Sequence, residues 1–173
     1  VDDLARDHRC LWFDNRGVGR SVPRGTRITV PQMAEDALQI LDAARVQSAH
    51  VVGHSLGGVV AQELALLAPE RVLSLSLLCT MARGREAGRT PGMAWLGLRS
   101  RIGTKRSRRR AFLRIVLPDP VLATADPDRL AAEFGELFGH DLAAHPLVEY
   151  LQLAALQRAD LTARLASIRT PTL

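Results

Sequence analysis

Apolar residues in the first 80 positions follow two different periods. Short apolar or alternating runs at 8–13, 48–52 and 72–79 have the length and composition of strands. Between them, apolar residues recur at helical spacing over 30–44 and fill the run 59–68. The pattern predicts the order β-α-β-α-β, which is typical of a parallel sheet with right-handed crossovers. In such sheets the catalytic loops lie at the carboxyl ends of the strands.

Beyond Thr80 the alternation ends and helical patterns separated by prolines follow. Four helices are predicted, and they cover 91–99, 104–117, 127–138 and 146–158. We interpret this stretch as an insertion between two parts of an α/β sheet. The residues 165–173 are typical of a linker that enters a further strand. Thr29 and Gln32 have the spacing of a capping box and mark the start of the first helix.

Length and composition bound the class of protein. With 173 residues, of which 47% are hydrophobic, the chain can bury a core of its own. No apolar stretch approaches the roughly 20 residues that span a bilayer, and no signal-peptide pattern is present, so we expect a cytoplasmic protein. The chain opens with Val1, and we expect it to be a piece of a longer protein. Cys10 and Cys79 lie in predicted strands and are expected to be reduced core residues.

The net charge of +5 comes from one segment. Nine of the 23 basic residues and no acidic residue lie between Ala87 and Pro118, so the rest of the chain is net negative. The simplest interpretation of Arg99 to Arg114 is a solvated helical face. The apolar residues from Phe112 to Leu117 leave open a contact with an anionic membrane surface. We expect no nucleic-acid binding, because the segment has neither interleaved aromatic residues nor a known binding motif.

The candidate chemistry lies directly after the second predicted strand. Gly53, His54, Ser55, Leu56 and Gly57 fit the pattern G-x-S-x-G, in which a strand turns sharply into a helix and presents a serine nucleophile. Small residues at the glycine positions are expected because side chains would crowd the turn. The same glycines, with Gly58, do not form a phosphate loop, since Val59 and Val60 follow them instead of Lys and Ser or Thr. The remaining alternative is an ordinary serine in a glycine-rich turn.

With these features the chain resembles the α/β-hydrolase family, specifically its members with a helical cap. Residues 13–21 are similar to the loop after the family's fourth strand, Gly53 to Gly58 to its nucleophile elbow, and Ile168 to Leu173 to the return from cap to core. The resemblance implies an α/β fold: a partial α/β-hydrolase core with a parallel sheet and an inserted helical cap. It divides the chain into core (1–81), cap (82–160) and return to the core (161–173).

The resemblance also implies the chemistry. Ser55 would be the nucleophile and the backbone N–H of Leu56 one oxyanion donor, acting on a small acyl substrate such as an ester, lactone or thioester. No cofactor and no metal are implied. The loop near the site would be structural, and its relevant residues are Asp14, Asn15, Arg16, Gly17 and Gly19.

Other family features are not found in the sequence. No His-Gly loop precedes Arg9, and the family's order of Ser, acid and His is not completed before Leu173. We therefore expect the triad acid and histidine to be absent from this chain, which alone would be nearly inactive. The histidines present at 8, 50, 54, 140 and 145 have structural interpretations, although one of the last two could reach the pocket from the cap.

Two other functions remain open from the sequence alone. A hydrolase-like binding protein would use the same fold without turnover. A C–C bond hydrolase or a cofactor-free oxidase would use the same elbow on other substrates. The oligomeric state is not indicated by any pattern.

Overall fold

A parallel pair of strands forms the centre of the protein. The computed structural model describes residues 2–22, 27–88 and 90–173. Strand β1 (Ala49–His54) pairs in parallel with β2 (Val72–Leu78), with His50 opposite Ser74 and His54 opposite Leu78. Both strands lie where the sequence predicts them, so the expected parallel sheet is confirmed.

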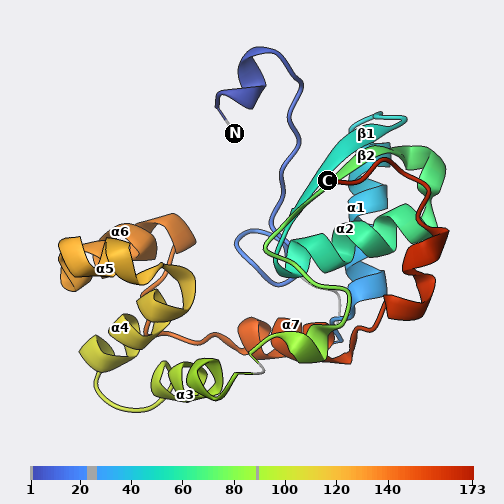
Figure 1. The fold of residues 1–173 in the computed structure, drawn as a ribbon. Helices are drawn as coiled ribbons and strands as arrows, with labels where there is room; N and C mark the ends of the chain where they lie inside the picture. Colours follow the sequence, from blue (N-terminus) through green and yellow to red (C-terminus); the bar gives the residue numbers. More distant parts are fainter. Residues whose placement is uncertain (1, 23–26, 89) are drawn as a thin grey trace.

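The C-terminal residues extend this sheet. The amide of Leu75 donates to the carbonyl of Pro171 at 2.9 Å, and the amide of Leu173 donates back to the carbonyl of Leu75 at 2.9 Å. Thr172 forms a parallel bridge with Leu75, so this end of the chain lies beside β2 (Figure 1). The predicted entry into a further strand is confirmed.

Two helices build the core beneath the strands. Helix α2 (Leu56–Leu67) packs against both strands, and α1 (Val30–Ala43) packs against α2. Helix α2 is apolar around most of its circumference, which is typical of a buried helix. The predicted start of α1 is confirmed, because the hydroxyl of Thr29 accepts a hydrogen bond from the Gln32 amide at 3.3 Å. The core between these helices and the strands contains Met33, Val59 and Leu75, which are almost completely buried.

The strand predicted at 8–13 is wrong. This segment is extended but belongs to no strand among the described residues, and it runs away from the sheet to a short 3-10 helix, η1 (Leu4–Arg6) (Figure 1). A strand requires a neighbour that pairs with its backbone amides and carbonyls, and no described strand lies beside this segment. Its apolar side chains, including Trp12 with 73% of its surface exposed, are therefore uncovered.

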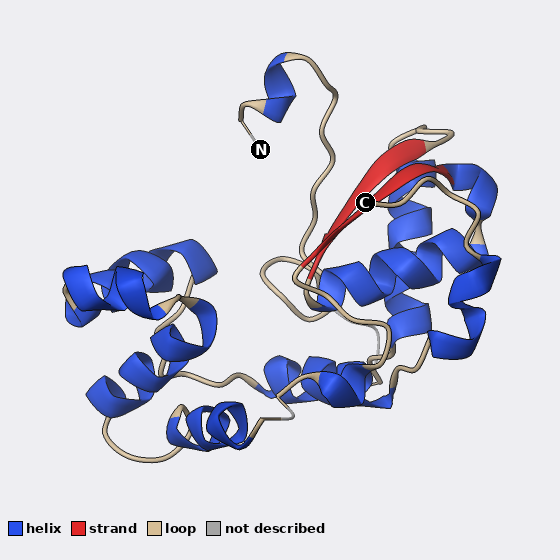
Figure 2. Cartoon of the chain, in the orientation of Figure 1, coloured by secondary structure: helices blue, strands red, loops and turns tan. Residues whose placement is uncertain are grey.

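All four helices predicted in the insertion are present. They are α3 (Pro91–Arg99), α4 (Lys105–Val116), α6 (Pro127–Phe138) and α7 (Leu147–Arg158). A fifth, α5 (Asp119–Thr124), was not predicted. Pro120 stands in its first turn, where a missing amide costs nothing. Figure 2 shows helices joined by loops, and no strand, in the described residues from α3 to α7.

The insertion has a small hydrophobic core of its own. Leu113, Ala131 and Leu142 are buried together, with Phe112 and Phe134 packed against them. Helix α7 differs from the other helices of the insertion, because its Ala155 and Leu156 are buried in the main core with α1, α2 and the strands. The division of the chain at residues 82 and 160 stays a prediction.

Three short 3-10 helices make the connections around the core. They are η2 (Pro69–Arg71), η3 (Gly84–Glu86) and η4 (Thr162–Ser167). Helix η3 packs on α7 so closely that a Cβ at Gly84 would lie 1.6 Å from the carbonyl oxygen of Leu156. Across the described ranges, no helix is both long enough and apolar enough to cross a membrane.

The arginine-rich helix α4 is not simply a solvated face. Arg106 and Arg110 lie beside Asp128 of α6, and Arg109 forms two hydrogen bonds of 2.7 Å with Asp141. The carboxylates that balance the positive charge of this helix lie far along the chain. Asp128 follows Arg106 by 22 residues, and Asp141 follows Arg109 by 32 residues. The apolar side of α4 is also used, because Phe112 and Leu113 pack into the core of the insertion.

The two cysteines are not the core strand residues that we expected. Cys10 is partly exposed in the unpaired N-terminal segment, and Cys79 is exposed directly after β2 ends. The backbone of Cys79 has a positive φ of 47°, so the chain turns there instead of continuing as a strand. Both cysteines are free.

Candidate active site

Ser55 occupies the single residue between β1 and α2. Its backbone has φ 52° and ψ −119°, a combination that non-glycine residues rarely adopt. Strain of this kind persists only where the surrounding structure enforces it, and it is most common at functional sites. The residue stands at the carboxyl end of β1, where a parallel sheet carries its catalytic groups.

The glycines around Ser55 have different reasons to be small. A Cβ at Gly53 would lie 2.6 Å from the carbonyl oxygen of Gly57, and a Cβ at Gly58 would lie 2.5 Å from the side chain of Thr80. A Cβ at Gly57 would have no neighbour within 4 Å outside its own helix turn. The expected crowding is therefore correct for Gly53 and wrong for Gly57, because Gly57 faces away from the strands at the open start of α2.

The peptide group after Ser55 is held from several sides. The Ser55 carbonyl accepts hydrogen bonds from the amides of Gly58 at 3.0 Å and Val59 at 3.4 Å, and from the hydroxyl of Thr80 at 2.7 Å. The Ser55 amide donates to the carbonyl of Leu78 at 3.0 Å and so continues the β1–β2 pairing. Leu56 is the first residue of α2, where amide groups have no acceptor within the helix.

Two residues at this site were missed by the sequence analysis. Besides Thr80, the side chain of Gln62 is buried and donates to the carbonyls of Gly58 and Met81, both at 3.1 Å. Buried polar side chains usually mark such fixed contacts. A glutamine inside the apolar run 59–68 was the only signal in the sequence.

The loop 14–21 is fixed by local contacts, as expected for a structural loop. A carboxylate oxygen of Asp14 accepts from the Arg20 amide at 3.2 Å and lies so close to Gly19 that no Cβ fits there. Gly17 has φ 84°, and a Cβ there would meet Val148 of α7 at 2.6 Å. The carbonyl of Asn15 accepts from the Val18 amide at 2.9 Å.

Arg16 anchors this loop to α1 instead of acting at Ser55. Its guanidinium makes two hydrogen bonds to Asp36, at 2.7 and 2.5 Å. The hydrogen bond to Asp36 raises the pKa of Arg16 above its ordinary value. Among the described residues, the hydrogen bonds of Asp14 and Arg16 go to Arg20 and Asp36 and not to Ser55.

Three of the described histidines, His50, His140 and His145, form hydrogen bonds with groups other than Ser55. His50 contacts Ser74 at 2.7 Å near the amino end of β1, and His54 is exposed beside the elbow. Both ring nitrogens of His145 are engaged, Nδ1 with Glu149 at 3.0 Å and Nε2 with the Ser100 carbonyl at 2.8 Å. His140 lies between the Asp141 carbonyl and the other carboxylate oxygen of Glu149. The two cap histidines thus connect helices of the insertion.

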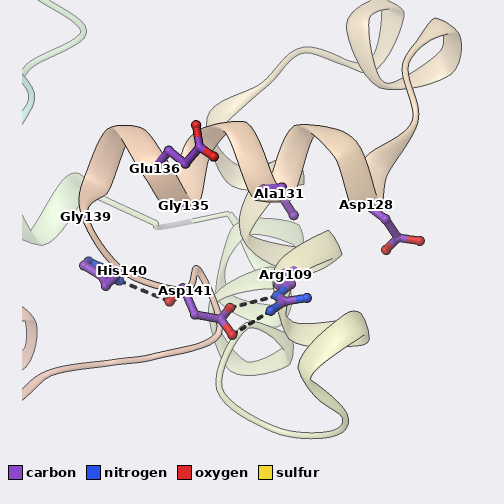
Figure 3. A pocket seen from close by; sticks show the side chains of 9 residues that line it. Arg109, Asp128, Ala131, Gly135, Glu136, Gly139, His140 and Asp141 are labelled. Carbon is purple, nitrogen blue, oxygen red and sulfur yellow. Dashed lines mark hydrogen bonds and ion pairs between the residues drawn. The ribbon is translucent and has the colours of Figure 1, made fainter.

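A hollow of about 500 Å³ lies within the insertion (Figure 3), and Ser55 is not among the residues that line it. Ala131, Gly135 and Gly139 form its small-residue side, and the paired Arg109 and Asp141 line it as well. The Arg109 guanidinium, with help from the Ala143 amide, holds the pKa of the Asp141 carboxyl well below its usual range. None of its lining residues comes from β1, α2 or the loop 14–21, so the hollow does not gather the predicted site residues.

In the part of the chain that the structure describes, no three His, Cys, Asp or Glu side chains are placed to hold a metal ion. The arrangement around Ser55 consists of a strained serine, a helix amino terminus and backbone hydrogen bonds. Such a group can present a hydroxyl to a substrate and an amide to a developing negative charge.

Comparisons with known proteins agree with this geometry. A family model described as alpha/beta hydrolase fold matches residues 1–160. A protein of Variovorax paradoxus named "Putative carbamate hydrolase RutD" is 33% identical over 174 residues, which cover 98% of this chain and 63% of the relative. The protein of the same name from Pseudomonas savastanoi pv. phaseolicola is 34% identical, with coverage of 100% of this chain and 67% of that relative.

Solved structures give the same result. A hydrolase from Pseudomonas aeruginosa superimposes with a TM-score of 0.73 at 33% identity, over 99% of this chain and 62% of that one. This chain thus spans only about three fifths of the length of that hydrolase. The family model covers residues 1–160, which is most of the sequence. The chain therefore belongs to the α/β-hydrolase family.

Proposed function

We propose that this chain carries the nucleophile of a serine hydrolase that cleaves small acyl substrates through an acyl-enzyme. The observation that supports this proposal most directly is the backbone of Ser55, strained at φ 52° between β1 and the amino terminus of α2. The same positions carry the sequence pattern of a nucleophile elbow. Arg45 and Cys79 also have positive φ, but of these three residues only Ser55 stands between a parallel strand and the amino terminus of a helix.

The proposed reaction has two steps. The Ser55 hydroxyl oxygen bonds to the acyl carbon while its proton passes to a general base, and the carbonyl oxygen becomes an oxyanion beside the Leu56 amide. The tetrahedral intermediate then expels the alcohol, thiol or amine, which takes up the proton. Water attacks the acyl-serine in the same way and releases the acid and free Ser55.

We propose an ester, lactone, thioester or related acyl compound as the substrate. The relatives named as carbamate hydrolases act, by that name, on a carbonyl with a heteroatom leaving group, which is the same bond class. The helical insertion, proposed as residues 82–160, would form the cap over this site. A small molecule without a cofactor fits such a site, and free Cys10 and Cys79 fit a cytoplasmic protein.

We infer that none of the five histidines of this chain is the general base. A base must lie within about 3 Å of the serine oxygen, and the cap histidines are engaged with Glu149 and Ser100. The triad acid and histidine would then be supplied from outside residues 1–173, where the relatives carry more chain. Under this proposal residues 1–173 alone are nearly inactive.

Covalent labelling of the natural full-length protein tests the proposal. A fluorophosphonate probe should modify the wild type at Ser55, and mass spectrometry should locate the adduct there. Ser55→Ala should abolish labelling, whereas Ser76→Ala, on the neighbouring strand, should leave it unchanged. A folded wild-type protein that takes up no label, or an S55A variant that still does, would contradict the proposal.

A second experiment, burst kinetics on the same full-length protein, tests the alternative function of a hydrolase-like binding protein. That function predicts no burst of product from 4-nitrophenyl acetate. Release of one equivalent of 4-nitrophenol in a rapid phase would show acyl-enzyme formation and exclude it. Profiling of ester, thioester and C–C substrates would then assign the bond type.

A further inference from the structure

Thr80 contacts the turn at Ser55, although it lies 25 residues further along the chain. The residue follows β2, and the positive φ of Cys79 turns the chain so that Thr80 lies beside the first turn of α2. Its hydroxyl donates to the Ser55 carbonyl at 2.7 Å, the shortest of the three hydrogen bonds which that carbonyl accepts.

The approach depends on Gly58. A Cβ at that position would lie 2.5 to 2.6 Å from the Cβ, Oγ1 and Cγ2 atoms of Thr80, so any larger residue would push Thr80 away. Gln62, one turn later in α2, links the same two segments. Its side-chain amide donates to the carbonyl of Gly58 in α2 and to the carbonyl of Met81, the residue after Thr80. Two consecutive residues after β2 are therefore attached to the start of α2.

The Ser55 carbonyl and the Leu56 N–H belong to one peptide group. A peptide group is planar and trans, so its N–H points in the direction opposite to its C=O. A hydrogen bond that fixes the carbonyl therefore also fixes the direction of the amide. A carbonyl that accepts a hydrogen bond also makes the amide of its peptide group a better donor.

We propose that Thr80 is a positioning residue for the oxyanion donor: through the Ser55 carbonyl, its hydroxyl sets the direction of the Leu56 N–H. This inference rests on the proposed function, because it assigns a role to the amide that would stabilise the oxyanion. Thr80 itself touches no reacting atom. Since the oxyanion exists only in the transition state and intermediate, Thr80 acts on kcat more than on KM.

Two substitutions at Thr80 in the natural full-length protein test the inference. Thr80→Val keeps the shape that packs on Gly58 but removes the donor, and kcat for 4-nitrophenyl acetate should fall about tenfold. Complete loss of an oxyanion donor costs about 100- to 1000-fold, and here the donor is misdirected rather than removed. KM should stay near the wild-type value. Thr80→Ser, which restores the hydroxyl, should restore kcat.

Thr124→Val is the matched control. The hydroxyl of Thr124 also donates to backbone carbonyls, those of Pro120 and Val121 at 3.4 and 3.3 Å, but it lies in α5 of the insertion. Its kcat should equal that of the wild type. If T80V does not fold, Thr80→Cys replaces it, because a thiol is a weaker donor and should give an intermediate kcat.

The outcomes separate the inference from the function on which it rests. If S55A retains turnover, Ser55 is not the nucleophile, and both the function and the inference are wrong. If S55A is inactive but folded T80V keeps the wild-type kcat, or Ser at position 80 does not rescue it, only the role of Thr80 is overturned. A fall in kcat with unchanged KM and rescue by Ser supports it.

Discussion

At the scale of single residues, Gly53 and Gly57 flank Ser55 symmetrically in the sequence but not in space. A Cβ at Gly53 would lie 2.6 Å from backbone atoms of both Gly57 and Gly58, which cannot move without distorting the elbow. We expect Gly53→Ala to lower the free energy of unfolding by about 1–3 kcal/mol, the usual cost of overpacking. Urea denaturation followed by circular dichroism measures the change.

Gly57→Ala is the paired control for this prediction. Position 57 is helical and open, so alanine should be neutral or should stabilise by up to about 1 kcal/mol through its better helix propensity. Equal destabilisation by both substitutions would show that the close contact at Gly53 does not determine the cost of adding a side chain there.

The motif G-x-S-x-G located the strained residue from the sequence, because its spacing is local. The contacts of Thr80 and Gln62 with the elbow could not be predicted in this way. They join residues 25 and 19 positions apart, and only the parallel crossover from β1 through α2 to β2 brings these residues together. Threonine after a strand and glutamine in an apolar helix are both too common to indicate such contacts.

At the scale of elements, the helices were predicted well because each carries its own signals. Helix α1 has a cap and an apolar stripe, and α6 is capped by Asp126, whose carboxylate accepts from the Asp128 amide at 2.8 Å. The run 8–13 has the residues of a strand but not the neighbour that a strand needs. Pairing is a property of two segments, and one segment alone cannot reveal it.

The arginines of α4 illustrate the same limit and lead to a prediction about pH. Arg109 and Asp141 pair across two elements, with 38% and 29% of their side-chain surfaces exposed. We expect Asp141→Asn to lower the urea midpoint for unfolding of the insertion at pH 7, since it removes the charge and one acceptor oxygen from this pair. Glu133→Gln is the control and should leave the midpoint unchanged, because its partner Arg129 is four residues away on one exposed helix face.

The pH dependence of the Asp141 effect has a definite sign. Hydrogen bonds from Arg109 and Ala143 lower the folded-state pKa of this carboxyl below its unfolded value, which is near 4. Its contribution is therefore fully present above the unfolded pKa and is lost as the pH falls through the folded pKa. The difference between wild type and D141N should be constant from pH 7 to about 5 and shrink toward pH 2. A difference that grew at low pH would contradict this assignment.

At the scale of the whole molecule, the buried apolar residues form two separate clusters. The main cluster joins α1, α2, β1 and β2, and the other joins α4 and α6 around Leu113. Helix α7 follows the second cluster in the chain but buries Ala155 and Leu156 in the first. The sequence predicts the helices of the insertion as one continuous unit. The periodicity of α7 does not indicate which of the two hydrophobic cores its apolar side packs into. Packing thus assigns α7 to the main core and not to the small core of the insertion.

Hydrogen exchange should show this division directly. Leu113 is fully buried, and Leu113→Ala should cost about 2–5 kcal/mol, enough to open the smaller cluster. Amide exchange should then accelerate in α4 and α6 but stay slow in α1, α2 and α7, because these helices share no buried contact with Leu113. Leu75→Ala, the counterpart in the main core, should accelerate exchange in α1, α2 and α7 together. If exchange in α7 instead accelerates together with α4 and α6 in the L113A variant, α7 unfolds as part of the cap. The predicted boundary at residue 160 then describes the unfolding unit better than a boundary before α7.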